Sequence, residues 1–244
     1  MQSKAEGSLN SKSIHDLCLL QSNQNQRDEH QLSHDARHGG EQRTGQKRAE
    51  REGRAGETCG AAAPKEMYVK LIEYAKKYNF YIVNDNAYSD IIFDGREGYS
   101  FLSIPGAKEV GIEFFSLSKS FDTTGARISF AIGNKKIIDA IKTIRSQYDF
   151  GMFLPIQYGA IAALTGETES VKAQCAEYQR RRDALCGGFR KIGWNVPDSE
   201  GTMFVWAPIP KNFVSSEEFW EALIDKTGIL CTPGNAFGPA GEGK

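Results

Sequence analysis

The sequence predicts an α/β fold, in which short buried strands alternate with helices around a largely parallel sheet. Three short apolar runs indicate the strands, at residues 80–83, 114–117 and 128–133. Each run is too short for a typical helix and is followed by polar or glycine-containing residues. Segments with helical periodicity precede and follow these runs. Short strands that alternate with helices are typical of sheets whose strands are mostly parallel.

Two stretches carry apolar residues at helical spacing, one after Pro64 and one after Lys135. Their apolar members are Met67, Leu71, Ile72 and Ala75 in the first and Ile137, Ile138, Ile141 and Ile144 in the second. A period of three to four residues places such side chains on one face of a helix. Both stretches are therefore predicted to be helices with one apolar stripe.

A break at Thr165-Gly166 separates a second, smaller α/β unit. Its predicted elements are a charged helix over 169–191, a strand over 203–207 and a helix over 216–227, which Ser215 or Ser216 would cap. The expected organisation is a polar tail over 1–60, part of a large domain over 61–165 and a small domain over 166–244.

Arg180, Arg181 and Arg182 form a basic triplet within the predicted charged helix. Such a triplet can bind phosphate or nucleic acid, or it can be the solvated face of a helix. Because Glu177 and Asp183 flank it, we favour the solvated face.

The first 60 residues differ sharply in composition from the rest. No aromatic residue precedes Tyr68, although Phe, Tyr and Trp make up 11% of the chain. A segment this polar cannot bury enough apolar surface to offset its ordering entropy. We therefore expect a disordered or weakly helical tail. His30, His34 and His38 would align on a helix and could bind zinc with Cys18, but we favour a polar tail with no metal site.

Composition also limits which binding partners and which cellular compartment are expected. The formal net charge is −1, which gives no electrostatic preference for nucleic acid or a membrane surface. No apolar stretch approaches the roughly 20 residues that a membrane helix needs, and no signal peptide is recognisable. The five cysteines are odd in number and scattered, which favours reduced thiols in a cytoplasmic protein.

Four polar residues lie where the predicted strands end. Asp85 and Tyr88 follow the first strand, Lys119 follows the second, and Arg127 precedes the third. Parallel sheets bind ligands at the carboxyl ends of their strands. Taken alone, Asp85 is more often a turn or cap residue, and Tyr88 is more often a core aromatic residue. The combined spacing of these residues with Ser116 favours a chemical site.

These motifs resemble those of the class I and II aminotransferases, which are pyridoxal phosphate (PLP) enzymes of fold type I. The resemblance extends from about Thr58 to Gly243. It rests on Asp-Asn-Ala-Tyr-Ser-Asp from Asp85, Ser-Leu-Ser-Lys-Ser-Phe from Ser116 and Thr-Gly-Ala-Arg-Ile-Ser-Phe from Thr124. All three are similar to motifs of the aspartate, alanine and diaminopimelate aminotransferase branch. The resemblance implies a partial PLP-binding large domain and a smaller C-terminal α/β domain.

The resemblance also implies a role for each motif residue. Lys119 would form the Schiff base with PLP, and Asp85 would pair with the protonated pyridine nitrogen. Tyr88 would bind the phenolic oxygen of the ring, while Ser116 and Arg127 would hold the phosphate. Family members share active sites across a two-fold interface, so a homodimer is also implied.

Several family features are absent from the sequence. No aromatic residue precedes Tyr68 to stack on PLP, and Glu57-Thr58-Cys59-Gly60 stands where the family has Asn-Pro-Thr-Gly. The chain ends at Lys244, just before the position of the family's substrate-carboxylate arginine. We therefore expect a member that is incomplete at both ends and has weak or no activity by itself.

The expected function is transfer of an amino group from an amino acid to a 2-oxo acid, with PLP as carrier. One alternative is a PLP-dependent carbon–sulfur lyase or decarboxylase of the same fold. A second alternative is a non-catalytic remnant or interaction module. A winged-helix regulator is disfavoured, because residues 1–60 lack the apolar pattern of a DNA-binding head.

Overall fold

A three-stranded sheet lies at the centre of the described chain, with strand order β1-β2-β3. The computed structural model describes residues 60–149 and 151–244. The strands are β1 (Ile82–Asp85), β2 (Gly111–Ser116) and β3 (Ser129–Gly133). All three predicted strands are therefore confirmed, although β1 begins and ends later, and β2 begins earlier, than the apolar runs indicated.

The sheet is mixed rather than largely parallel. Strands β1 and β2 are parallel, with Asp85 opposite Phe114, whereas β2 and β3 are antiparallel, with Ser116 opposite Ser129. The connections explain this difference. A long segment with short helices returns the chain from the end of β1 to the start of β2, as a parallel pairing requires. The shorter loop between β2 and β3 reverses the chain directly.

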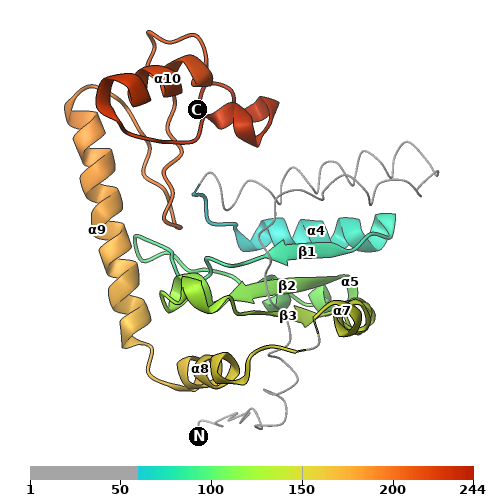
Figure 1. Cartoon of the computed structure of the whole chain (residues 1–244). Helices are drawn as coiled ribbons and strands as arrows, with labels where there is room; N and C mark the ends of the chain where they lie inside the picture. Colours follow the sequence, from blue (N-terminus) through green and yellow to red (C-terminus); the bar gives the residue numbers. More distant parts are fainter. Residues whose placement is uncertain (1–59, 150) are drawn as a thin grey trace, which may run out of the picture.

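Helices surround the sheet and extend beyond it (Figure 1). The α-helices are α4 (Lys65–Tyr78), α5 (Ala107–Val110), α6 (Leu117–Ser120), α7 (Lys135–Tyr148), α8 (Leu154–Thr165), α9 (Glu169–Lys191) and α10 (Ser216–Thr227). The 3₁₀ helices are η1 (Phe101–Ser103), η2 (Thr124–Ala126), η3 (Gly234–Phe237) and η4 (Pro239–Gly241). The long helix α9 runs along one side, from α8 near the sheet to the region of α10.

Local sequence explains where several helices begin and end. The Asn134 side chain accepts bonds from the backbone N–H groups of Lys136 and Ile137, which caps α7. Ser215 accepts a bond from the Glu218 N–H, so its predicted role as the cap of α10 is confirmed. At the end of α4, Asn79 adopts the left-handed conformation that terminates many helices.

Two apolar clusters hold the sheet and its helices together. The first, which we call the α4 cluster, consists of Tyr68, Leu71, Ile72, Ala75, Phe101, Ile104, Ala107 and Val110. It joins α4, η1 and α5 against one face of the sheet. The second cluster consists of Leu117, Ile128 and Ala160, and it joins α6 to α8.

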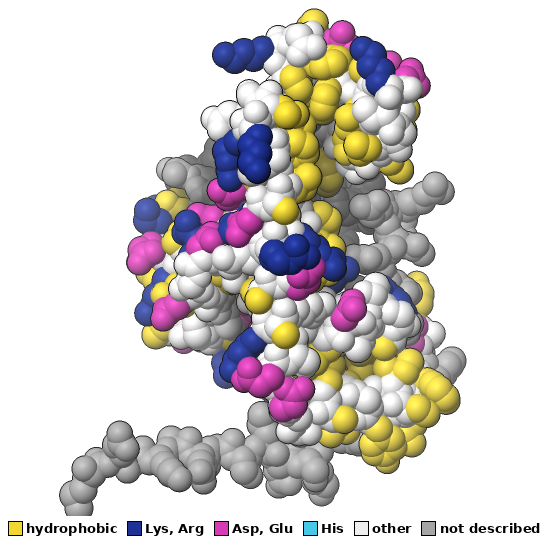
Figure 2. All heavy atoms as spheres, turned by 90° about the vertical axis from the view of Figure 1, so that its left-hand side faces the viewer, with side chains coloured by type: hydrophobic (Ala, Val, Ile, Leu, Met, Phe, Trp, Pro, Cys, Tyr) yellow, Lys and Arg dark blue, Asp and Glu magenta, His cyan; other side chains and the backbone are white. Residues whose placement is uncertain are grey.

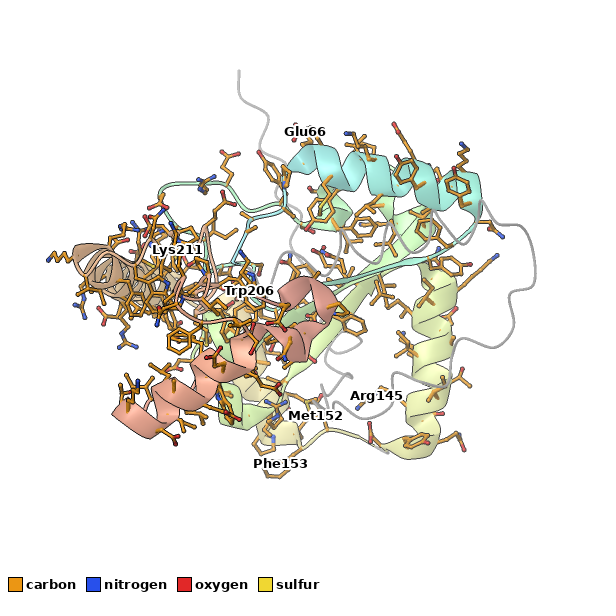
Figure 3. All side chains as sticks on the ribbon, turned by 90° about the horizontal axis from the view of Figure 1, so that it is seen from above. Glu66, Arg145, Met152, Phe153, Trp206 and Lys211 are labelled. Carbon is orange, nitrogen blue, oxygen red and sulfur yellow. The ribbon has the colours of Figure 1, made fainter. Side chains whose placement is uncertain are left out.

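The helical region after β3 differs from the expectation. The predicted helix after Lys135 is present as α7. However, no residue of α7 is fully buried, and Ile144 is 59% exposed. The helix ends at Tyr148, and a separate helix, α8, follows. Figure 3 shows Met152 and Phe153 in the segment that leads into α8, beyond Arg145 of α7. Met152 packs against the second cluster.

The predicted strand over 203–207 is wrong, because this segment forms no strand in the described structure. The chain instead makes one isolated antiparallel bridge just before it, between Gly201 and Ile92. The Thr202 N–H donates to the Ile91 carbonyl at 2.8 Å. Contacts with the loop after β1 therefore replace a strand pairing. The boundaries predicted for α9 and α10 are confirmed.

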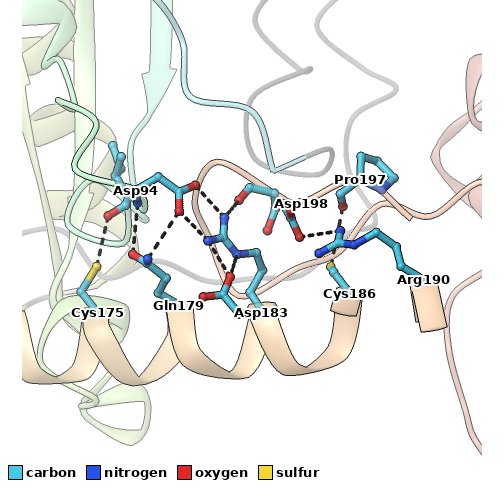
Figure 4. A network of polar contacts seen from close by, with 11 residues as sticks. Asp94, Cys175, Gln179, Asp183, Cys186, Arg190, Pro197 and Asp198 are labelled. Carbon is cyan, nitrogen blue, oxygen red and sulfur yellow. Dashed lines mark hydrogen bonds and ion pairs between the residues drawn. The ribbon is translucent and has the colours of Figure 1, made fainter. Parts of the chain in front are cut away.

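The arginine triplet of α9 divides into two environments. Arg180 and Arg181 are exposed and pair with Glu177, as expected for a solvated face. Arg182 is only 6% exposed. Its guanidinium binds both carboxylate oxygens of Asp94, at 2.7 and 2.8 Å, and the Ser199 carbonyl at 2.6 Å (Figure 4). Arg182 therefore fastens α9 to the loop after β1.

Further polar contacts extend this attachment along α9. Gln179 accepts a bond from the Asp94 N–H, and the Cys175 thiol donates to the Ile92 carbonyl. Arg190 pairs with Asp198 at 2.9 Å. No helix within 60–149 or 151–244 combines the length and apolar composition needed to cross a membrane.

Candidate active site

Asp85 is the last residue of β1 and lies beside β2. Its Cα is paired with that of Phe114, and the next N–H along the chain, that of Asn86, donates to the Phe114 carbonyl at 2.9 Å. The Asp85 residue keeps substantial exposed surface. Surrounding protein atoms nevertheless raise the pKa of its carboxyl by desolvation, and a bond from the Ala87 N–H partly offsets that rise.

Lys119 lies in α6, the single turn that follows β2 directly. Its Nζ is 5.6 Å from the centroid of the Tyr88 ring, within the range of a cation–π contact. The side chain is half-buried. The structure therefore brings together the lysine and the tyrosine that the sequence places 31 residues apart (119 − 88).

Short polar bonds hold α6 in place. The Ser116 Oγ accepts a bond from the Ser118 N–H at 3.2 Å and caps the helix. The Thr123 hydroxyl donates to the Leu117 carbonyl at 3.0 Å. A helix of one turn has little stability of its own. These bonds, together with burial of Leu117, fix the direction of Lys119.

A further bond joins α6 to the loop that carries Tyr88. The Ser120 hydroxyl donates to a carboxylate oxygen of Asp90, and Ser120 is buried. Ser120 is adjacent to Lys119, and Asp90 lies two residues after Tyr88. The contact between Lys119 and Tyr88 is therefore supported by a hydrogen bond between their own segments.

Ser116 and Arg127 lie on neighbouring segments at the same end of the sheet. Ser116 is opposite Ser129 in the antiparallel pairing, and Arg127 lies two residues before Ser129. Arg127 adopts a positive φ of 54°, which turns the chain sharply before β3. One of its guanidinium nitrogens donates to the Thr124 carbonyl at 3.2 Å. A hydroxyl and a guanidinium so placed suit an anionic group.

All five sequence-predicted residues thus lie at or just beyond the ends of three adjoining strands. In type they are a carboxylate, a phenol, an amine, a hydroxyl and a guanidinium. These are the groups that PLP requires, since its enzymes use a lysine for the aldehyde, a carboxylate for the ring nitrogen and cationic groups for the phosphate. The position of Asp85 and Lys119 at the carboxyl ends of the parallel pair β1 and β2 fits such a ligand.

Two residues near this site were missed by sequence reasoning. The Phe204 ring meets the Tyr88 ring edge to face, with centroids 5.6 Å apart. No sequence signal links residues so distant along the chain. Glu113, in the middle of β2, is completely buried. A charged residue within the apolar run Ile112-Glu113-Phe114-Phe115 was the available signal for it.

Comparison with known proteins identifies the family. Residues 56–244 match the family model described as aminotransferase class I and II. This match covers more than half of the chain. The chain belongs to the class I and II aminotransferases.

Curated relatives of this chain agree with the family. The LL-diaminopimelate aminotransferase of Halothermothrix orenii is 45% identical over 184 residues, which cover 75% of this chain and 47% of that protein. The glutamate-pyruvate aminotransferase AlaC of Escherichia coli is 40% identical over 179 residues, covering 72% of this chain and 43% of that protein. The chain spans about half the length of the curated relatives it matches.

Solved structures show the same relationship. Substrate-bound BacF from Bacillus subtilis superimposes with a TM-score of 0.74 at 36% identity, over 76% of this chain and 47% of that one. A probable N-succinyldiaminopimelate aminotransferase from Thermus thermophilus gives a TM-score of 0.69 at 30% identity, over 75% and 49%. The fold is therefore that of part of a fold type I aminotransferase.

Proposed function

We propose that this chain binds PLP through Lys119 and takes part in transfer of an amino group from an amino acid to a 2-oxo acid. The observation that carries the proposal is the contact of Lys119 with Tyr88, beside Asp85, at the ends of β1 and β2. Both curated relatives and the Thermus thermophilus structure are named as aminotransferases, which supports transamination over lyase or decarboxylase chemistry.

PLP, when bound, supplies an electron sink for the substrate's α-carbon. Asp85 would accept a hydrogen bond from the protonated pyridine nitrogen and so keep that proton in place. Desolvation disfavours the ionised form of Asp85 and raises its pKa, whereas an adjacent cation favours that form. A cationic ring nitrogen would therefore compensate the cost that the protein imposes on this carboxylate.

The other residues would divide binding and proton transfer between them. Lys119 would hold the cofactor and, as a neutral amine, move a proton at the substrate's α-carbon. Tyr88 would donate a hydrogen bond to the phenolic oxygen of the ring, and its own ring already lies 5.6 Å from the Lys119 Nζ. Ser116 and Arg127 would hold the phosphate, which anchors the ring at a distance from the reacting atoms.

The proposal extends to a homodimer in the cytoplasm. Exposed apolar residues gather on α7, α8 and the segment between them, namely Ile144, Tyr148, Phe153, Leu154, Tyr158 and Leu164. Figure 2 shows hydrophobic side chains collected over the lower part of one face, where α8 lies. Apolar patches of this kind often mark protein–protein contacts. Sedimentation velocity would show a dimer, and a monomer at all concentrations would contradict this part of the proposal.

Titration of the chain with PLP tests the cofactor proposal directly. Binding through Lys119 should produce a visible absorption band at roughly 400–430 nm, and borohydride reduction should attach the cofactor covalently to Lys119. Lys119→Ala should abolish both signals. The matched control is Lys136→Ala, which alters an exposed lysine of α7 and should leave both unchanged. An unaltered band in Lys119→Ala would refute the assignment.

Product analysis tests the reaction separately. With alanine and 2-oxoglutarate as substrates, transamination yields pyruvate and glutamate. With cystathionine, a carbon–sulfur lyase would release a thiol product instead. Release of the thiol product without amino-group transfer would overturn the proposed reaction while leaving the cofactor site intact.

A further inference from the structure

Glu113 is a buried carboxylate on β2, and no cationic partner reaches it within residues 60–149 and 151–244. Its exposed surface is 0%, and it takes part in none of the ion pairs among residues 60–149 and 151–244. Burying a charge without a counter-charge is unfavourable unless hydrogen bonds replace the lost water. The surroundings of Glu113 supply those bonds.

Five donors reach the two carboxylate oxygens of Glu113. They are the Asn84 Nδ2 at 2.9 Å, the Asn86 Nδ2 at 2.7 Å and the Phe101 N–H at 3.2 Å on Oε1, with the Ser100 Oγ at 2.5 Å and the Leu102 N–H at 3.3 Å on Oε2. An ionised carboxylate only accepts hydrogen bonds, and it has about four lone-pair directions. All five bonds are donated to Glu113, so they suit a carboxylate that accepts at both oxygens and donates at neither.

Two of these donors flank Asp85 in the sequence. Asn84 lies in β1 and Asn86 directly follows it, and both side chains reach Glu113 on the same face of the sheet. Because side chains alternate along an extended segment, Asp85 between them lies on the opposite face. Both amides bind the same oxygen, Oε1 of Glu113. The backbone of Asn86 is also tied to β2, through its N–H and the Phe114 carbonyl. A rotation of the Asp85 segment would break these bonds together.

The remaining donors connect Glu113 to the α4 cluster. Ser100 precedes η1, and Phe101 and Leu102 belong to it. Phe101 is a completely buried member of that cluster. Glu113 thus joins the two residues around Asp85 to the buried α4 cluster.

We propose that Glu113 is a positioning residue, which fixes the orientation of Asp85 toward the PLP ring nitrogen by holding Asn84 and Asn86. This inference rests on the proposed function, since Asp85 is the residue assigned there to the cofactor. Glu113 itself touches neither cofactor nor substrate, because it acts from the opposite face of the sheet.

A matched pair of variants in the full chain tests this role. Asn86→Ala and Ser100→Ala each remove one hydrogen bond to Glu113, but only Asn86 flanks Asp85. Ser100→Ala also loses the bond from the Leu102 N–H to the Ser100 Oγ at 3.2 Å, so the control is at least as disruptive to the fold. We expect PLP affinity to fall about tenfold in Asn86→Ala and less than about threefold in Ser100→Ala. Thermal midpoints should fall by similar amounts in both.

Glu113→Gln gives a second variant with nearly unchanged shape. Its amide nitrogen would face donors instead of accepting from them, so we expect a loss of PLP affinity at least as large as in Asn86→Ala. Equal losses of affinity in Asn86→Ala and Ser100→Ala would overturn the positioning role. So would unchanged affinity in Asn86→Ala.

Amide hydrogen exchange separates failure of this role from failure of the proposed function. Absence of the PLP band in the unmodified chain would refute the proposed function. The Ala87 N–H bonds to the Asp85 carboxylate. The hydrogen-exchange rate of this amide would then decide whether Glu113 orders the segment around Asp85. Faster exchange in Asn86→Ala than in Ser100→Ala supports the ordering role, and equal exchange in the two variants overturns it.

Discussion

The two faces of β1 differ in packing, and only the more open face carries a residue of the candidate site. On one face, Ile82 packs against the α4 cluster and Asn84 binds the buried Glu113. On the other face, Val83 is 62% exposed and Asp85 also keeps accessible surface. Alternation along the strand allows one short segment to serve both purposes. The closely packed face holds the backbone, while the open face presents the carboxylate.

The largest expected effect on stability comes from truncating a large side chain that packs under the closed face of β1. Phe101→Ala should lower the free energy of unfolding by about 3–5 kcal/mol, because it leaves a cavity in a site with 0% exposure. Val83→Ala on the open face should change it by less than about 0.5 kcal/mol. Urea denaturation of the two variants measures the contrast. A cost for Val83→Ala close to that of Phe101→Ala would show that the open face is covered in solution.

The same contrast recurs along α9. Arg182→Ala should destabilise the fold by about 2 kcal/mol, since it deprives Asp94 and the Ser199 carbonyl of a buried donor. Arg181→Ala removes an exposed pair with Glu177 and should cost less than about 0.5 kcal/mol. Thermal or urea unfolding would compare them. Equal costs would mean that burial of Arg182 adds nothing to its ion pair.

A smaller effect is expected where the loop of Tyr88 meets α6. Ser120→Ala removes the bond to Asp90 and should cost about 1 kcal/mol of stability. Because that bond supports the contact of Lys119 with Tyr88, PLP affinity should also decrease. Thr143→Ala, which removes an exposed side-chain bond to the Asp139 carbonyl within α7, is the control for affinity. An unchanged PLP titration in Ser120→Ala would contradict the supporting role.

The smallest expected effect has the opposite sign. Desolvation raises the pKa of the Asp85 carboxyl in the folded chain. Protonated Asp85 therefore contributes its full stability below the unfolded pKa of about 3.9. That contribution is lost as the pH rises through the folded pKa. Asp85→Asn should therefore slightly stabilise the PLP-free chain at pH 7, and this advantage should shrink toward pH 4. Urea midpoints at the two pH values provide the measurement. The same variant should weaken PLP binding.

Much of the local structure could be predicted from the sequence. Apolar runs indicated all three strands, a cap at Ser215 or Ser216 located the start of α10, and a charged stretch located α9. These signals are local, since they depend on side-chain period and backbone capping. The predictions that failed depend on distant partners. The segment over 203–207 has strand-like composition, but nothing in its own residues determines whether a second strand lies beside it.

The sequence by itself determined which polar residues form the candidate site, because motif spacing brings Asp85, Tyr88 and Lys119 to strand ends in any fold of this kind. Only the tertiary structure decided what surrounds them. The mixed sheet, the burial of Arg182 and the five donors around Glu113 arise from contacts between residues far apart in the chain. Such contacts form when apolar surfaces pack and their enclosed polar groups must find partners. No local sequence pattern predicts which residues will be the partners of these buried polar groups.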